Sequence, residues 1–194
     1  MAQRPLLVLV GGPPASGKTT LARRVAGALS LPLLSRDAIT EWIAEGAGTE
    51  SLTETERLAR GAIRVFYETG AELLRAGAGV VMEQAFQRGV AEDQVRVLIE
   101  GAGAVQITCV LPPEEAVRRY VARFERGERH AAHFDAARIE RVRSGQRQID
   151  WSRFEPLDLE IPTLRVDTAD GYAPPFEDIV AFAALGDASV NTRR

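Results

Sequence analysis

The sequence predicts an α/β domain in which a parallel β-sheet is covered by helices on both faces. Short apolar runs alternate with longer segments of helical period, and the first apolar run leads directly into a glycine-rich turn and a helix. The chain has 194 residues and is 45% hydrophobic, which suits one core better than two. We therefore expect a single domain over residues 1–184 and a disordered tail over residues 185–194.

Five apolar runs are expected as strands, and helical spacing separates them. The strands are Leu6–Val10, Leu33–Ser35, Val80–Met82, Val105–Leu111 and Leu164–Asp167. The first helix is marked by Leu21, Val25 and Leu29, and a long helix by Leu58, Ala62, Val65, Phe66 and Leu73. A further amphipathic helix carries its apolar stripe on Val117, Tyr120, Val121 and Phe124. The segments expected to be irregular are Gly46–Thr53, Arg126–Phe134 and the C-terminal tail.

Composition excludes several classes of protein. The net charge of -3 provides no general attraction to nucleic acid or to an anionic membrane. The apolar run Leu6–Val10 is too short for a signal peptide or a membrane span. The single cysteine, Cys109, cannot support a disulfide framework and is expected in the core. We therefore expect a cytoplasmic protein with no membrane partner.

The glycine-rich turn has the pattern of a phosphate-binding loop. Residues Gly12–Thr19 match GxxxxGK(S/T), and Lys18 is the only lysine in a chain with 23 arginines. Such a loop wraps backbone N–H groups around phosphate oxygens at a helix N-terminus. Pro13 and Pro14 have no N–H, so the donors are expected from Ala15 to Thr20. A plain glycine turn between a strand and a helix is the alternative.

The loop predicts that ATP and Mg²⁺ are the cofactors. Lys18, as a solvent-accessible side chain, would neutralise charge on the β and γ phosphates during catalysis, and the Thr19 hydroxyl would bind the metal. The residues expected to bind the nucleotide here are Gly12, Ala15, Ser16, Gly17, Lys18, Thr19 and Thr20. Ras-type GTPases are excluded, because their guanine-binding Asn-Lys-x-Asp motif needs a second lysine. The run Val80–Gln84 also matches poorly the strand ending in Asp-Glu that motor and AAA-type ATPases carry.

Four segments together resemble the small P-loop kinases of the nucleoside-monophosphate-kinase-like group. They are GGPPASGKTT, LLSRDAI, VVMEQAF and RRYVARFERGERH, the last followed by RVDT, within roughly residues 5–170. That group includes zeta-toxin-like kinases, chloramphenicol phosphotransferase, gluconate and shikimate kinases, and the kinase domain of polynucleotide kinase. The resemblance implies a three-layer P-loop NTPase fold with strand order 2-3-1-4-5 and an arginine-rich lid at about residues 126–137. It also implies transfer of the γ-phosphoryl group of ATP to a hydroxyl group.

The acceptor is expected at the carboxyl edge of the sheet, where Asp37 follows the second strand. The resemblance implies that Asp37 faces the acceptor hydroxyl, either accepting its proton or orienting it. The alternative is an N-cap of the helix near Ala38, although Ser35 could serve instead. Arg36 would touch the acceptor or a phosphate, or else lie exposed. Glu83 and Gln84 would bind the acceptor or a magnesium-bound water, or else form a buried polar strand end.

Nine arginines lie between Arg118 and Arg147, together with His130 and His133. Arg119, Arg123 and Arg126 share one helix face, which is usually solvated. The resemblance implies that Arg119 stacks on adenine and that Arg123 or Arg126 reaches the phosphates as charge spreads in the transition state. Asp167 and Thr168 would contact adenine through the loop that follows them, or form an ordinary turn. The two histidines lack further ligands at a zinc-site spacing and are expected on the lid surface.

The sequence leaves the acceptor and the oligomeric state open. We expect a small hydroxyl-bearing molecule, because the net charge is negative and the aromatic residues Tyr120 and Phe124 fall on an apolar stripe expected in the core. One alternative is a polynucleotide 5′-hydroxyl kinase, for which the Arg36–Asp37 pair is suggestive. Another is an ATP-binding switch or ATPase without an acceptor.

Overall fold

A computed structural model describes residues 4–47, 52–128, 130 and 150–188. Its centre is a sheet of five strands, all parallel, in the order β2-β3-β1-β4-β5. The strands are β1 (Leu6–Gly11), β2 (Leu33–Ser35), β3 (Val80–Glu83), β4 (Gly103–Val110) and β5 (Thr163–Asp167). The predicted fold class and strand order are therefore confirmed, with strand boundaries shifted by at most two residues from those expected.

Strand β1 lies at the middle of the sheet, and its side chains alternate between two cores. Leu7 and Leu9 belong to one apolar cluster, while Val8 and Val10 belong to the other. Because both faces of a parallel sheet are covered, the strand is apolar at every position instead of alternating with polar residues. Leu7 pairs in register with Val80 of β3 and with Ala104 of β4.

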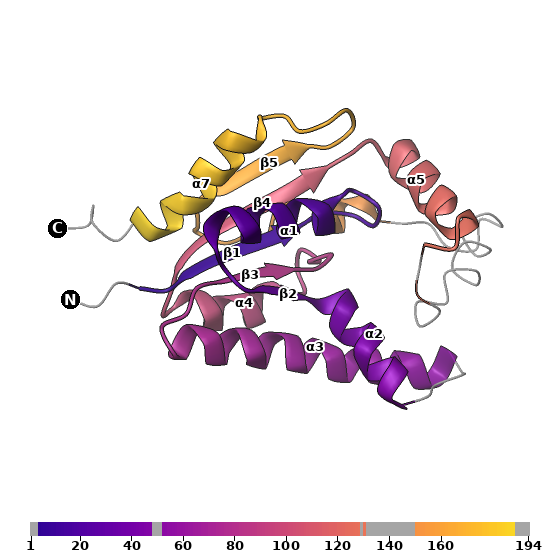
Figure 1. Ribbon diagram of the computed structural model, residues 1–194, viewed down its shortest axis with the longest axis horizontal. Coiled ribbons are helices and arrows are strands. Elements are labelled where there is room, and N and C mark those ends of the chain that lie inside the picture. The colour runs from indigo at the N-terminus through magenta and orange to yellow at the C-terminus, as the bar shows by residue number, and fades with distance from the viewer. Residues whose placement is uncertain (1–3, 48–51, 129, 131–149, 189–194) are drawn as a thin grey trace.

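Helices cover the sheet in two layers (Figure 1). On one side lie α1 (Lys18–Leu29) and α7 (Phe176–Ala188), and on the other lie α3 (Leu52–Arg75) and α4 (Glu92–Ile99). The first layer packs Leu21 and Ile179 onto the sheet, and the second packs Phe66 and Leu98. Of these helices, α1 and α3 follow the predicted stripes, although Val65 of α3 is 45% exposed.

Two helices lie beyond the carboxyl ends of the strands, where Figure 1 shows them at the right of the molecule. They are α2 (Arg36–Ala47) and α5 (Pro113–Glu125). In α5 the expected core stripe is not realised: Ala116 is its buried residue, Tyr120 is partly buried and Phe124 is 38% exposed. The reason is position, because α5 projects from the end of the sheet instead of lying across its face.

Other expectations about boundaries need correction. The C-terminal helix α7 extends to Ala188, so residues 185–188 are helical and only 189–194 of the expected tail lie outside the described residues. The expected irregular segments are likewise only partly described: α2 continues to Ala47 and α3 begins at Leu52. Of the expected lid, residues 129 and 131–137 also lie outside the described residues. Within the part of the chain that is described, no helix is long and apolar enough to cross a membrane.

Candidate active site

The phosphate-binding loop joins the central strand β1 to helix α1. At Gly12 the backbone has φ 132°, and a Cβ added there would lie 2.5 Å from the carbonyl oxygen of Cys109. Glycine is therefore required by both conformation and close approach. Gly17 is the N-cap of α1 with φ 79°, and Ala15 has φ 62°. A non-glycine residue in this left-handed region stores strain, which the packed surroundings of the loop must balance.

The start of α1 provides backbone donors for an anion. Leu21 donates its N–H to the carbonyl of Gly17 at 3.0 Å, which closes the first turn. The N–H groups of Lys18, Thr19 and Thr20 therefore have no acceptor within the helix and sit at its positive end. Ser16 differs from the other expected donors, because its N–H bonds the carbonyl of Pro13 at 3.3 Å. The loop thus uses that N–H for its own turn.

Lys18 is more buried than expected. Its side chain is 7% exposed, and Nζ donates to the carbonyl oxygen of Pro13 at 3.3 Å. The expectation of a solvent-accessible loop residue is corrected, because Lys18 is the first residue of α1, is buried there and donates back into the loop. The ammonium group is therefore held close to the loop that would wrap the phosphates.

A buried carboxylate connects the loop to the neighbouring strands. Glu83, at the end of β3, is 1% exposed and accepts hydrogen bonds from the hydroxyls of Thr19 at 3.2 Å and Ser35 at 2.7 Å. Parallel register brings these residues together, since Glu83 pairs with Val10 on one side and with Ser35 on the other. Hard oxygen donors of this kind suit Mg²⁺, which in kinases binds few protein ligands and several phosphate oxygens. The donor set therefore fits the expected metal.

Asp37 lies in the first turn of α2 and not at its N-cap, because the helix already begins at Arg36. Its Oδ1 is 2.6 Å from Nη2 of Arg36, and its side chain is 28% exposed. A carboxylate in the first turn is also favoured by the helix dipole. The ion pair with Arg36 orients the Asp37 carboxylate, while part of the side chain stays accessible to a ligand.

One cavity of about 590 Å³ joins the loop, α2 and α5. The residues of the sequence-predicted site that line it are Ala15, Gly17, Lys18, Thr19, Thr20, Asp37, Arg119, Arg123 and Arg126. The other predicted site residues, Gly12, Ser16, Arg36, Glu83, Gln84, Asp167 and Thr168, are absent from its described wall, although Arg36, Glu83 and Thr168 bond to wall residues. Gln84 instead donates to the hydroxyl of Tyr67 at 2.7 Å, and burial raises the pKa of that tyrosine to about 12.

The wall also contains residues that sequence reasoning missed. They are Arg23, Ser35, Ala38, Glu41, Arg118, Ala122 and Glu128. Helical spacing could have pointed to two of them, since Arg23 follows Thr19 by four residues and Glu41 follows Asp37 by four. The contribution of Ser35 depends on the register of β2 against β3, which the sequence does not reveal.

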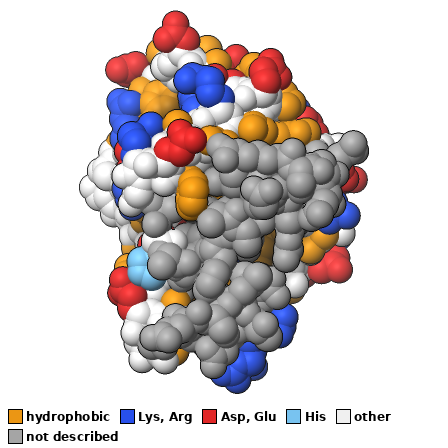
Figure 2. All heavy atoms as spheres, turned by 90° about the vertical axis from the view of Figure 1, so that its right-hand side faces the viewer, with side chains coloured by type: hydrophobic (Ala, Val, Ile, Leu, Met, Phe, Trp, Pro, Cys, Tyr) orange, Lys and Arg blue, Asp and Glu red, His pale blue; other side chains and the backbone are white. Residues whose placement is uncertain are grey.

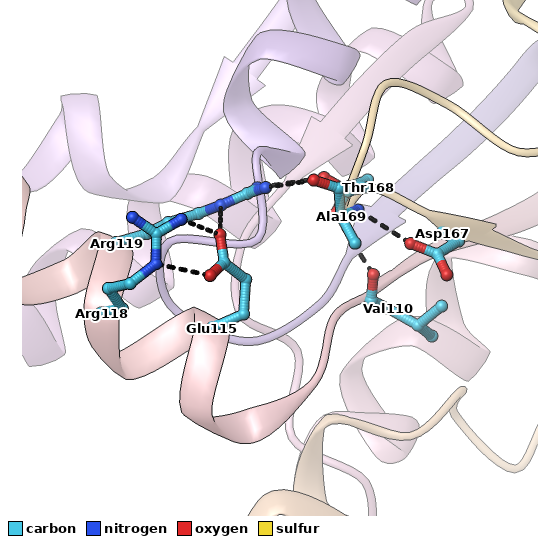
Figure 3. A network of polar contacts seen from close by, with 7 residues as sticks. All are labelled: Val110, Glu115, Arg118, Arg119, Asp167, Thr168 and Ala169. Carbon is cyan, nitrogen blue, oxygen red and sulfur yellow. Dashed lines mark hydrogen bonds and ion pairs between the residues drawn. The ribbon is translucent and has the colours of Figure 1, made fainter.

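The residues predicted to contact adenine form a connected network (Figure 3). Arg119 donates from Nε to Glu115 at 2.7 Å, from Nη1 to the carbonyl of Thr168 at 3.0 Å and from Nη2 to that of Ala169 at 2.7 Å. The Asp167 carboxylate accepts from the N–H of Ala169 at 2.8 Å. Arg119 therefore ties α5 to the loop after β5.

Glu115 holds two arginines at once. Hydrogen bonds from Arg118, and next from Arg119, lower the pKa of Glu115 to about 2, so it is ionised at neutral pH. Further along α5, Arg123 faces the cavity and Arg126 pairs with Glu128. His130 lies 3.2 Å from Glu45 of α2, whereas His133 lies outside the described residues.

The end of the molecule that bears α2 and α5 carries charge of both signs. Figure 2 shows blue and red side chains close together on the described part of this face, without a continuous basic stripe there. The cavity wall has the same character, since Asp37 and Glu41 of α2 face the same space as the arginines of α5. Within the wall the positive side chains come from α1, from α5 and from Arg126 just after it, and the negative ones come from α2 and from Glu128.

Comparison with known proteins places this geometry in a family. A family model described as an AAA domain matches residues 7–149. A crystal structure of a candidate kinase from Chloroflexus aurantiacus J-10-fl is 32% identical, with a TM-score of 0.79 over 97% of this chain and 99% of that chain. A sugar kinase from Janibacter sp. HTCC2649 is 19% identical with a TM-score of 0.55 over 98% and 99%, a likeness of fold alone.

A curated relative adds a match in sequence. The cytidylate kinase of Acidiphilium cryptum is 30% identical over 131 residues, and the match spans 61% of this chain and 61% of that protein. The phosphate-binding loop, the strand order and these relatives agree with one another. The chain belongs to the AAA domain family and, within it, to the small P-loop kinases.

Proposed function

We propose that this protein transfers the γ-phosphoryl group of ATP, with Mg²⁺, to a hydroxyl group of a small acceptor molecule. The observation that carries the proposal is the shared cavity: it brings Lys18 and Thr19 of the loop, Asp37 of α2 and the arginines of α5 to one space. A donor and an acceptor bound there would meet between a carboxylate and several cations. That is the arrangement that in-line phosphoryl transfer requires.

The loop and α1 would hold the triphosphate. The first N–H groups of α1 would bind phosphate oxygens, and the Lys18 ammonium would exchange its bond to Pro13 for the β and γ phosphates. Thr19 would bind the metal directly, while Glu83 would orient Thr19 and accept from a metal-bound water. Mg²⁺ supplies charge neutralisation on the β and γ oxygens.

Asp37 would act on the acceptor. Its carboxylate takes the proton of the attacking hydroxyl as the new O–P bond forms and the bond between the γ-phosphorus and the bridging oxygen breaks, releasing ADP. Arg36 would position that carboxylate through their 2.6 Å pair. Arg123 and Arg126 face the same cavity and would stabilise the negative charge that spreads over the transferring group.

A second candidate acceptor is the phosphate of a nucleoside monophosphate, which is favoured by the match to a cytidylate kinase. The two acceptors make different demands on Asp37. A hydroxyl must lose a proton to attack, whereas a phosphate monoester, with a second pKa of about 6, is already largely ionised at neutral pH. A base is therefore required only for the hydroxyl acceptor.

The test is a screen for acceptor-stimulated ADP release by the full chain with Mg²⁺ and saturating ATP. Sugars, nucleosides, aminosugars, antibiotics, nucleoside monophosphates and oligonucleotides are offered in parallel, each with wild type and with Asp37→Asn. We expect a small hydroxyl compound to stimulate release and Asp37→Asn to remove the stimulation. Stimulation by a monophosphate that survives Asp37→Asn favours the second candidate. ATP hydrolysis with no response to any acceptor contradicts both.

A further inference from the structure

The Ser35 hydroxyl lines the cavity with its proton already used. Ser35 pairs in register with Glu83 and donates to the buried carboxylate of that residue at 2.7 Å. A hydroxyl has one proton and two lone pairs. Because the proton is directed at Glu83, Ser35 offers the cavity only lone pairs. It can therefore accept a hydrogen bond from a ligand, but it cannot donate one while the bond to Glu83 is kept.

The side chains that α2 adds to the wall have the same hydrogen-bonding character. Asp37 and Glu41 lie four residues apart on the helix and carry carboxylate oxygens, which accept, and Ala38 has no polar side-chain atom. A carboxylate has about four lone-pair positions, so the pair with Arg36 leaves Asp37 able to accept again. Within the described wall, the side chains from β2 and α2 therefore offer acceptors and no donor.

The N-terminus of α2 does not reverse this character. A helix start by itself favours an anion, because its first N–H groups lack acceptors within the helix. In α2 the first turn already contains the Asp37 carboxylate, which supplies that negative charge. A ligand carboxylate or phosphate placed there would meet Asp37, and Glu41 one turn further, as like charges.

The donor side chains of the cavity come from other elements. They are the cations of α1 and α5 and the arginine just after α5, namely Lys18, Arg23, Arg118, Arg119, Arg123 and Arg126. These side chains donate and do not accept, which suits the oxygens of a triphosphate. The two substrates of a phosphoryl transfer would thus meet different surfaces. The triphosphate meets donors, and the acceptor molecule meets the accepting side chains of β2 and α2.

We infer that the acceptor molecule is a non-anionic polyol, with or without an amino group, and that a group next to its reacting hydroxyl donates a hydrogen bond to Ser35. This inference rests on the proposed function, because it names the substrate class of the same site. Ser35 and Asp37 are two residues apart and line one cavity, so a hydroxyl that reaches Asp37 has Ser35 nearby. A carboxylate or phosphate beside that hydroxyl is disfavoured by the charge of α2.

The first experiment compares acceptors that share a carbon skeleton. ADP release by the full chain is measured with Mg²⁺ and saturating ATP for glucose, glucosamine, gluconate and glucose 6-phosphate, and for cytidine and CMP. Any other compound that stimulates release in the acceptor screen is paired with its own amino, carboxylate and phosphate derivatives. We expect kcat/KM of the non-anionic members to exceed that of their anionic counterparts by about tenfold or more, because like charges at close range repel.

The second experiment tests Ser35 itself with the best non-anionic acceptor. Ser35→Ala removes the lone pairs, and we expect the KM of the acceptor to rise about fivefold to tenfold with kcat within about twofold, as for the loss of one hydrogen bond in binding. Ser35→Thr keeps the hydroxyl and should restore the KM to within about twofold of wild type. The control is Ser152→Ala, because the Ser152 hydroxyl also donates to a carboxylate, that of Asp150, but lies outside the cavity wall.

The outcomes separate this inference from the proposed function. If an anionic member is used as well as its non-anionic counterpart or better, the inferred substrate class is wrong, while the transfer reaction stands. If Ser35→Ala weakens activation by Mg²⁺ and leaves the KM of the acceptor unchanged, Ser35 belongs to the metal site and its inferred role is wrong. If no compound stimulates ADP release, the proposed function is refuted, and the inference with it.

Folding of each variant is verified by circular dichroism. The comparison of acceptors uses wild type, so it decides the substrate class even if Ser35→Ala does not fold. In that case Ser35→Cys serves in place of Ser35→Ala, because a thiol is a weak acceptor of similar size. A KM for the acceptor that is unchanged in folded Ser35→Ala or Ser35→Cys, with Mg²⁺ activation also unchanged, overturns the role of Ser35.

Discussion

The two ends of the cavity are built differently. At the phosphate end Ser16, Glu83 and Lys18 are 0%, 1% and 7% exposed, and their positions follow from packing between β1, β3 and α1. At the α5 end only Ala116 is buried within the described helix. There Arg118, Arg119 and Arg126 form ion pairs with Glu115 and Glu128, and Arg119 also bonds the carbonyls of Thr168 and Ala169. Packing in a core is rigid, whereas exposed ion pairs each contribute little.

This contrast indicates a division of work between a preformed part and an adjustable part. We expect the phosphate loop to be preformed, because Gly12 lies close to Cys109 of β4 and the buried Glu83 is bonded to Thr19 and Ser35. In the proposed mechanism Arg126 would exchange its carboxylate partner Glu128 for a phosphate oxygen at small cost, since a surface ion pair is weak. We expect substitutions at the first end to act on binding and chemistry together, and substitutions at the second to act mainly on turnover.

The largest effect is expected at Lys18. Lys18→Met keeps the packed stem and removes the charge, and we expect phosphoryl transfer to fall by about 10³-fold or more, because charge stabilisation on the transferring phosphoryl is lost. The loss of one hydrogen bond to Pro13 should leave the domain folded. Turnover and thermal unfolding are measured together. Full activity in folded Lys18→Met would contradict the phosphate-loop assignment.

Asp37→Asn tests the acceptor side of the cavity. We expect kcat to fall by roughly 10² to 10⁴, the range for a general base, with ATP affinity within a few-fold of wild type. Glu45→Gln is the matched control, because Glu45 lies two helical turns further along α2 and pairs with His130 outside the cavity wall. Single-turnover kinetics and nucleotide binding are compared for both variants. If only ATP binding were weakened, Asp37 would belong to the magnesium site and not to the acceptor site.

At the α5 end the prediction is smaller. Arg123→Ala or Arg126→Ala should lower kcat by about tenfold, and nucleotide affinity less, because contacts formed on closure act mainly in the transition state. Arg75→Ala is the control, since Arg75 is an exposed arginine paired with Glu72 on α3. If nucleotide affinity and turnover fell equally, the proposed difference between the two ends of the cavity would be wrong. Unchanged turnover in the double variant Arg123→Ala, Arg126→Ala would show that these arginines lie on a solvated face and take no part in the transfer.

The smallest effect concerns salt. The acceptor KM should change little between low and moderate salt at saturating ATP, because a small acceptor releases few counterions. A single-stranded nucleic acid would instead lose about 0.7 log units of affinity per contacted phosphate for each decade of salt. The mixed charge on the described part of the α5 end agrees with a weak dependence of the acceptor KM on salt. A salt dependence of KM that corresponds to three or more contacted phosphates, together with phosphorylation of an oligonucleotide 5′-hydroxyl, would favour the polynucleotide kinase.

Much of the phosphate end was predictable because its signals are local. The loop pattern, the strand before it and the helix after it are contiguous in the sequence, and the resemblance supplied the strand order. The α5 end was predicted less well. Its apolar stripe suggested a core helix, yet Phe124 is 38% exposed, because periodicity reports an amphipathic helix without saying which surface covers it.

The sequence by itself determined the parallel α/β fold, the phosphate loop and the P-loop kinase family, since each depends on residue patterns of short range. Tertiary structure decided which side chains meet at the carboxyl edge of the sheet. Register brings Ser35 and Thr19 onto Glu83, and the path of the chain after β5 brings Thr168 onto Arg119. Those contacts join residues far apart in the chain, and only the packing of the whole sheet with its helices sets the distances between them.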